Sequence, residues 1–205
     1  DVSLSARTSD NELVHGEHNI SERGGAIRDL FLNPPDAEAH PDAVRAILDA
    51  DLVVIGPGSL YTSIMPNLLV GGIQKALFAT SACRIFVCNV ATQHGETDGF
   101  TVSDHLTALE HHSGKGLIHG VVANNNIAST LPEAWHSAPV PVSKTRMDAF
   151  EGVLLVEEDV VAEENRYRHD PVKLAATILR MYDDRDSFTF SVAPAVAEEP
   201  VLITR

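Results

Sequence analysis

The stretch that decides the fold is Asp51-Leu-Val-Val-Ile55, followed at once by Gly56-Pro-Gly-Ser-Leu-Tyr-Thr-Ser63. The first part is a short, β-branched apolar run, which predicts a strand buried on both faces. The second part is a glycine-bounded turn leading into a helical stretch from Leu68 to Ala79, interrupted by Gly71-Gly72. A strand that turns through glycines into a helix is the basic unit of an α/β sheet.

The same order of elements repeats along the chain. Apolar runs at 85–90 and 117–123 predict two more strands, and residues 103–112, followed by Gly114, predict a helix between them. This spacing predicts an α/β fold, a mainly parallel sheet with helices on both faces. The flanking segments predict a hairpin of Val2–Ala6 with Leu13-Val14, a helix at Val44–Leu48, a strand at Gly152–Val156 and a helix from Asp170-Pro171.

The length of 205 residues favours one domain over residues 1–187, with 188–205 as a weak strand or loose tail. Residues 128–147, rich in Pro and Ser, predict a long connection. Because the chain begins at Asp1 and enters a strand immediately, we expect it to be a piece of a longer protein.

Composition excludes several classes of function. With 15 Lys+Arg against 29 Asp+Glu, the formal charge of −14 argues against binding to nucleic acid or to an anionic membrane. No stretch approaches the ~18 apolar residues of a membrane-spanning helix, so no membrane insertion is expected. Cys83 and Cys88 are too few for a disulfide scaffold, which favours core positions and a reducing cytoplasm.

The loop after the first strand is a candidate phosphate cradle. Gly58 lets the backbone approach a ligand, and Ser59, Thr62 and Ser63 add hydroxyl donors. Ligands of open α/β sheets bind beyond the carboxyl ends of the strands, where this loop lies. The alternative, of equal weight for the glycines alone, is a tight turn with a helix N-cap.

A second polar loop follows the next strand and is expected to open on the same edge. It brings together amide, hydroxyl and carboxylate groups from Asn89, Thr92, Gln93, Glu96, Thr97 and Asp98. The carboxylates suit ribose or sugar hydroxyls, or a divalent cation such as Mg²⁺ held against a diphosphate. The alternative is that Glu96 and Asp98 cap the following helix.

Histidines and arginines elsewhere give weaker signals. His94, His105, His111 and His112 lack the spacing of a known metal motif, and a solvated helix surface is favoured over a metal site. Arg166 and Arg168 interrupt an acidic run before the last helix. One interpretation is that one of these arginines reaches a phosphate, and the alternative is a local salt bridge to the acidic neighbours.

Two long motifs, Gly56–Val70 and Gly95–Thr101 followed by Asp104-His105, resemble the gluconeogenesis factor family, bacterial relatives of 2-phospho-L-lactate transferase. The resemblance extends from Val2 to about Ile178. It implies a Rossmann-like core, binding of UDP-sugars, notably UDP-N-acetylglucosamine, and a role in carbon metabolism and cell shape in the cytoplasm.

The resemblance also assigns two contacts outside the loops. Arg168 matches an arginine placed against the nucleotide sugar, and Trp135 stands where relatives carry Tyr, so that stacking is kept without the hydroxyl contact. The complete predicted ligand-binding set is Gly56, Gly58, Ser59, Tyr61, Thr62, Ser63, Asn89, Thr92, Gln93, Glu96, Thr97, Asp98, Trp135 and Arg168.

The chain departs from the family pattern at its start, because it lacks the glycine-rich strand–loop–helix and the Asp-Asp-Gly-Gly segment. We therefore expect a domain incomplete at its N-terminus. Three functions follow in order of preference: a regulatory protein that binds a nucleotide sugar, a Mg²⁺-dependent transferase of a 2-phospholactyl-type group, and a scaffold that binds proteins through its acidic surface. No catalytic residue is assigned, and a homo-oligomer is left open.

Overall fold

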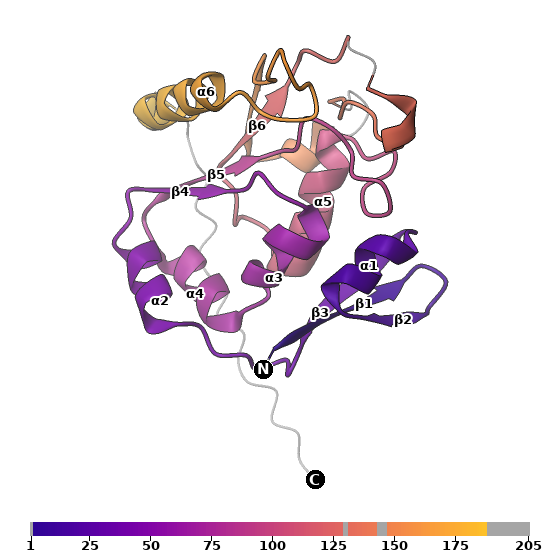
Figure 1. The fold of residues 1–205 in the computed structure, drawn as a ribbon. Coiled ribbons are helices and arrows are strands. Elements are labelled where there is room, and N and C mark those ends of the chain that lie inside the picture. Colours follow the sequence, from indigo (N-terminus) through magenta and orange to yellow (C-terminus); the bar gives the residue numbers. More distant parts are fainter. Residues whose placement is uncertain (1, 129–130, 143–146, 188–205) are drawn as a thin grey trace.

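The computed structural model describes residues 2–128, 131–142 and 147–187. Their strands form an antiparallel sheet of order β2-β1-β3 and a parallel sheet of order β4-β5-β6-β7 (Figure 1). The strands are β1 (Ser3–Thr8), β2 (Leu13–His15), β3 (Ile27–Asn33), β4 (Leu52–Ile55), β5 (Cys83–Val87), β6 (Gly120–Asn124) and β7 (Leu154–Glu158). The α-helices are α1 (Glu17–Arg23), α2 (Pro41–Leu48), α3 (Met65–Leu68), α4 (Gly71–Ala79), α5 (Val102–Ser113) and α6 (Pro171–Asp183).

The parallel sheet is covered on both faces, as predicted. Side chains of β5 alternate: Ile85 and Val87 pack with α6, whereas Phe86 packs with the cluster that includes α3 and α5. Figure 1 shows α6 on one side of this sheet and α2 to α5 on the other. Every residue of β5 and β6 is buried, which explains their continuous apolar runs.

The strand predicted at residues 51–55 is less buried than expected. β4 pairs with β5 and forms an edge of the parallel sheet within the described part of the chain. Val54 is therefore 41% exposed, and only Ile55 is fully buried, so the prediction of burial on both faces is wrong. An apolar run of four residues does not distinguish a central strand from an edge strand.

The predicted helix at 68–79 is divided. A π-helix, η1 (Leu60–Ile64), continues into the single turn of α3, and α4 begins separately at Gly71. The helix predicted at 103–112 is α5, which starts with a capping box between Thr101 and Asp104 and ends at Gly114. The helix α6 starts as predicted, with Asp170 accepting from the amides of its first turn.

The N-terminal segment forms a small unit around the antiparallel sheet. The predicted hairpin is confirmed, with Ser5 opposite His15, but β3 on the other edge of β1 and the short helix α1 were not predicted. Leu4, Leu30 and Leu32 of this unit join the same core as the parallel sheet.

Two further expectations concern the C-terminal half. The long connection at 128–147 contains a short 3₁₀ helix, η2 (Glu133–Trp135), and the predicted tail at 188–205 lies outside the described residues. Among the helices of the described ranges, none has the length and apolar character needed to span a membrane.

Candidate functional site

The two glycine-bounded loops lie together at the carboxyl edge of the parallel sheet. The Asn89 amide joins them, because Nδ2 donates to the Gly58 carbonyl at 2.8 Å and Oδ1 accepts from the Gly58 amide at 3.2 Å. Gly56 has a φ of +88°, and a Cβ there would lie 3.0 Å from the Val87 carbonyl oxygen. The predicted juxtaposition of the two loops is therefore confirmed, and it depends on close backbone approach.

The hydroxyl groups of the first loop divide into two sets. Ser59 and Ser63 are accessible, and Ser59 makes no side-chain capping bond to η1. Thr62 is buried and donates to Glu96 Oε1 at 2.9 Å. The π-helix thus leaves Ser63 exposed while Thr62 fixes the loop to Glu96, and π turns of this kind are frequent at functional sites.

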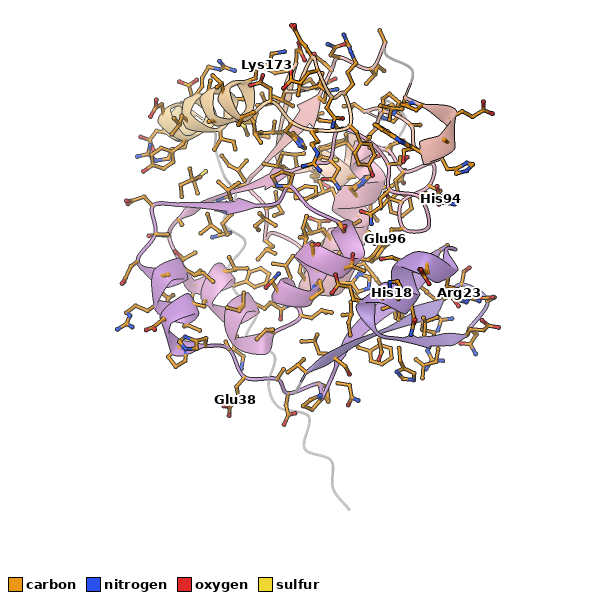
Figure 2. The ribbon with its side chains drawn as sticks, viewed as in Figure 1. His18, Arg23, Glu38, His94, Glu96 and Lys173 are labelled. Atoms are coloured by element: carbon orange, nitrogen blue, oxygen red, sulfur yellow. The ribbon has the colours of Figure 1, made fainter. Side chains whose placement is uncertain are left out.

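Glu96 is the centre of the buried side of the site. Its side chain is 3% exposed, and Oε1 accepts from Ser21 Oγ, Thr62 Oγ1 and Gln93 Nε2 at 2.8–2.9 Å. Figure 2 shows Glu96 between α1 and the helical segment that contains η1. The second oxygen, Oε2, is buried and has no hydrogen-bond partner among the described residues. A buried carboxylate oxygen without a donor is costly, which points to a donor that this part of the chain does not supply.

The second loop is packed tightly against α1. Gly95 has a φ of +85°, and a Cβ there would lie 2.6 Å from the Ser21 carbonyl oxygen and 3.3 Å from the Gly24 Cα. Only glycine fits this contact without movement of the backbone. The helix α1 therefore fixes the loop that carries Glu96.

Three residues of the predicted binding set instead hold the loops in place. Thr97 Oγ1 accepts from the Gln93 amide at 2.9 Å, and Thr92 Oγ1 accepts from the Ala138 amide at 2.9 Å. Tyr61 is buried with its ring edge-on to Phe100, and burial, followed by the negative charge of Glu96, raises its pKa to about 12. The Tyr61 phenol is therefore neutral at physiological pH.

Asp98 lies on the outer side of the second loop. Its carboxylate accepts from the Gly95 amide at 2.7 Å and lies 3.1 Å from His94 Nδ1. Because Thr101 and Asp104 cap α5, the alternative that Glu96 and Asp98 cap this helix is wrong. Asp98 shapes the turn and remains accessible beside the site.

Two later segments reach the same edge. Trp135 is 46% exposed, and its ring lies edge-on to that of Tyr167, with 5.5 Å between the ring centroids. This contact brings the segment that contains Arg168 beside the 131–140 loop. His169 Nε2 lies 3.2 Å from the Cys88 carbonyl oxygen, so that this segment is attached to the end of β5. Arg168 is exposed next to this contact.

Two of the three α5 histidines do not lie on the solvated surface that was predicted. His105 is 1% exposed, and its Nδ1 is 2.9 Å from the Thr101 carbonyl oxygen. His112 is partly buried and packs edge-on against Tyr61, whereas His111 is exposed. Because His105 and His112 are polar, the sequence did not indicate that they pack against the core. Within the ranges that the structure describes, no three His, Cys, Asp or Glu side chains gather as a metal site.

Comparison with known proteins identifies the family. A family model described as 2-phospho-L-lactate transferase CofD matches residues 1–161. The chain belongs to the CofD family. This result confirms the resemblance drawn from the two glycine-containing motifs.

The CofD-family relatives include proteins named gluconeogenesis factor. The one from Halalkalibacterium halodurans is 36% identical over 182 residues, covering 87% of this chain and 56% of the relative. The one from Bacillus subtilis is 36% identical over 183 residues, covering 87% and 57%. The chain therefore spans little more than half the length of these relatives.

A crystal structure of a UPF0052 family protein from Bacillus halodurans superposes with a TM-score of 0.79 at 36% identity. The match covers 87% of this chain and 59% of that one. The Rossmann-like fold expected for a CofD-family member is consistent with this agreement and with the four-stranded parallel sheet.

Part of the candidate site could not be predicted from the sequence. Ser21 lies in α1, Gly24 follows directly after this helix, and Tyr167 comes from the segment before α6. The pair Gly24-Gly25 was the available signal, because adjacent glycines after a short polar segment indicate close backbone packing. No local pattern marks Ser21, whose partner Glu96 is 75 residues away.

Proposed function

We propose that this chain binds a nucleotide sugar of the UDP-N-acetylglucosamine type at the carboxyl edge of its parallel sheet. In this proposal it acts in the cytoplasm as a regulatory protein of carbon metabolism and cell shape. Membership of the CofD family and relatives named gluconeogenesis factor support the family-level role. The nucleotide sugar and the location are parts of the proposal.

The accessible groups at this edge suit the parts of such a ligand. Ser59 and Ser63 offer hydroxyl donors beside a glycine turn, which suits diphosphate oxygens. Arg168 supplies the positive charge that the loops lack. The exposed Trp135 ring offers a stacking surface for the base.

The observation that carries the proposal is the arrangement around Glu96. Three donors hold one carboxylate oxygen, while the buried Oε2 has no donor in the described part of the chain. A sugar or ribose hydroxyl is a suitable donor, and its approach requires movement of the side chains that cover Oε2. The side chains that fix Glu96 come from both loops and from α1, so a ligand there would be held by both loops.

Thermal stabilisation of the full chain by UDP-N-acetylglucosamine tests the proposal. Ligand at ~100 times its Kd stabilises a one-site protein by about 2.7 kcal/mol, or roughly 5–11 °C for a chain of this size. Arg168→Ala should remove most of this shift, whereas Arg45→Ala, on the exposed helix α2, should leave it unchanged. The proposal fails if the wild-type chain is not stabilised by any UDP-sugar, or if both variants respond equally.

A second candidate is a Mg²⁺-dependent transferase of a 2-phospholactyl-type group from a nucleotide diphosphate donor. The observation that favours it is the family model itself, which is described as a transferase. The accessible Asp98 is suited to hold Mg²⁺ against a diphosphate, and Glu96 is its nearest acidic neighbour in the loop. Metal-dependent turnover that Asp98→Asn abolishes would support it, and turnover unchanged in that variant would remove Asp98 from the mechanism.

A further inference from the structure

His112 joins the antiparallel sheet to the main body of the protein. Its Nε2 accepts a hydrogen bond from the Leu30 amide of β3 at 3.1 Å, and its Nδ1 is 2.8 Å from the Ala108 carbonyl oxygen. A carbonyl oxygen only accepts and an amide N–H only donates, so Nδ1 carries the proton and Nε2 does not. The imidazole must therefore be neutral for both bonds to exist.

We propose that His112 is an acid-sensitive latch between β3 and α5. Addition of a proton at Nε2 places an N–H group against the Leu30 N–H group, so the hydrogen bond is lost and two donors face each other. Leu30 is paired with Ala6 of β1 along the opposite edge of β3, so the strand itself persists. Acid thus weakens the attachment of the antiparallel sheet without unfolding that sheet.

The surroundings of His112 decide the pH range. A surface pocket of about 390 Å³ lies over the ring and gives it access to solvent. The charged and titratable groups that line this pocket or act on the ring are His111 and Asp104 from α5, Arg28 and Asp29 from β3, and Tyr61 from η1.

These groups do not all favour the same charge state of His112. Burial is the largest influence and lowers the His112 pKa; the charge on His111 lowers it further, whereas Asp29 and the bond to Ala108 raise it. Asp29 is itself paired with Arg28 at 2.9 Å, which reduces its influence. Since the folded-state pKa lies below that of a free histidine, the latch is intact above pH 6.5 and weakens as pH falls below that value.

The latch also concerns the candidate site. The antiparallel unit includes α1, and Ser21 of α1 donates to Glu96. A weaker contact between β3 and α5 therefore acts on the unit that supplies one of the three donors to the Glu96 carboxylate. This consequence rests on the proposed function, in which Glu96 faces the ligand, whereas the latch itself does not.

Hydrogen exchange of the full chain tests the latch directly. Protection factors, corrected for the intrinsic pH dependence of exchange, are measured at pH 7.5 and pH 5.5 for β3 and for β6 as an internal reference. We expect protection of the Leu30 amide to fall about tenfold more than that of β6, as loss of one hydrogen bond implies. In parallel, ¹⁵N chemical shifts of the His112 ring should report the Nδ1–H tautomer at pH 7.5.

Two matched variants separate the latch from a general acid effect. His112→Gln keeps an acceptor oxygen but cannot titrate, so its β3 protection should no longer depend on pH. His18→Gln, at an exposed histidine of α1 that pairs with Glu22 of the same helix, should behave as wild type. Equal pH dependence of β3 and β6 in the wild-type chain, or an Nε2–H tautomer at pH 7.5, would overturn the proposal.

Binding of UDP-N-acetylglucosamine at the two pH values provides a separate measurement. Weaker binding at pH 5.5 in wild type but not in His112→Gln supports the link to Glu96. Equal pH dependence in both proteins overturns that link. Absence of binding at both pH values contradicts the proposed function but not the latch, because hydrogen exchange decides separately whether the latch exists.

Discussion

The contact between Gly95 and α1 gives a prediction with a built-in control. Gly95 and Gly99 lie in the same loop with φ values of +85° and +72°. An alanine Cβ at position 95 would lie 2.6 Å from the Ser21 carbonyl oxygen, whereas at position 99 it would meet nothing within 4 Å. The two substitutions therefore share backbone strain and differ in the steric contact.

The magnitudes follow from these geometries. Left-handed backbone costs a residue with a Cβ roughly 1–2 kcal/mol, partly offset by about 0.4–1 kcal/mol from the restricted unfolded chain. Gly99→Ala should thus lower the free energy of unfolding by about 1 kcal/mol. Gly95→Ala adds overpacking of roughly 1–3 kcal/mol. The difference of about 2 kcal/mol corresponds to roughly 4–8 °C in Tm for a chain of this length.

Differential scanning calorimetry and urea unfolding of both variants measure this difference. Because Gly95 adjoins Glu96, Gly95→Ala should also weaken nucleotide-sugar binding, while Gly99→Ala should not. Equal destabilisation by the two substitutions would refute the claim that the loop and α1 are in close contact. Stability lost only at position 95, with binding unchanged, would instead refute its link to the ligand site.

Two further predictions use the same unfolding assays, and a third uses an NMR titration. Leu109→Ala, at a fully buried position of α5, should cost about 2–5 kcal/mol in urea unfolding, whereas Leu48→Ala, at a residue 45% exposed, should cost much less. Thr101→Ala removes the capping box of α5 and should cost about 1 kcal/mol, with Thr107→Ala on the same helix as a comparison; an equal loss in both variants would contradict a specific capping effect. Burial and the adjacent Arg84 charge lower the pKa of His119 to about 4, so its contribution to stability is complete above pH 6.5 and declines between pH 6.5 and 4; an NMR titration midpoint near 6.5 would contradict this.

The parallel sheet could be predicted because its signals are local. β5 and β6 are buried on both faces, so their apolar runs correspond directly to their positions in the core. Helices α5 and α6 carry their N-terminal signals within a few residues of their starts, at Thr101 and Asp170. The loops after β4 and β5 had to meet because adjacent parallel strands end at the same edge.

The remaining features depend on contacts between distant segments. The helix α1 is short and polar, buries only Ile20, and is held by its packing against Gly95. The burial of Glu96 requires Ser21 and Thr62, which no local pattern links to it. His112 of α5 is polar in sequence, and its partial burial follows from the contacts of β3 and η1 with that helix.

The double hydrogen bond between Asn89 and Gly58 sets the spacing of the two loops through main-chain atoms of the first one. Side chains on either side of Gly58, at Pro57 and Ser59, take no part in this bond. Substitutions of Ser59 can therefore alter which chemical groups a bound molecule meets while the spacing of the two loops is conserved. Asn89→Asp, in contrast, would replace one donor by an acceptor and set two oxygen atoms against each other. In this short turn, side-chain atoms therefore determine which groups a ligand meets, and main-chain atoms of Gly58 determine the spacing of the two loops.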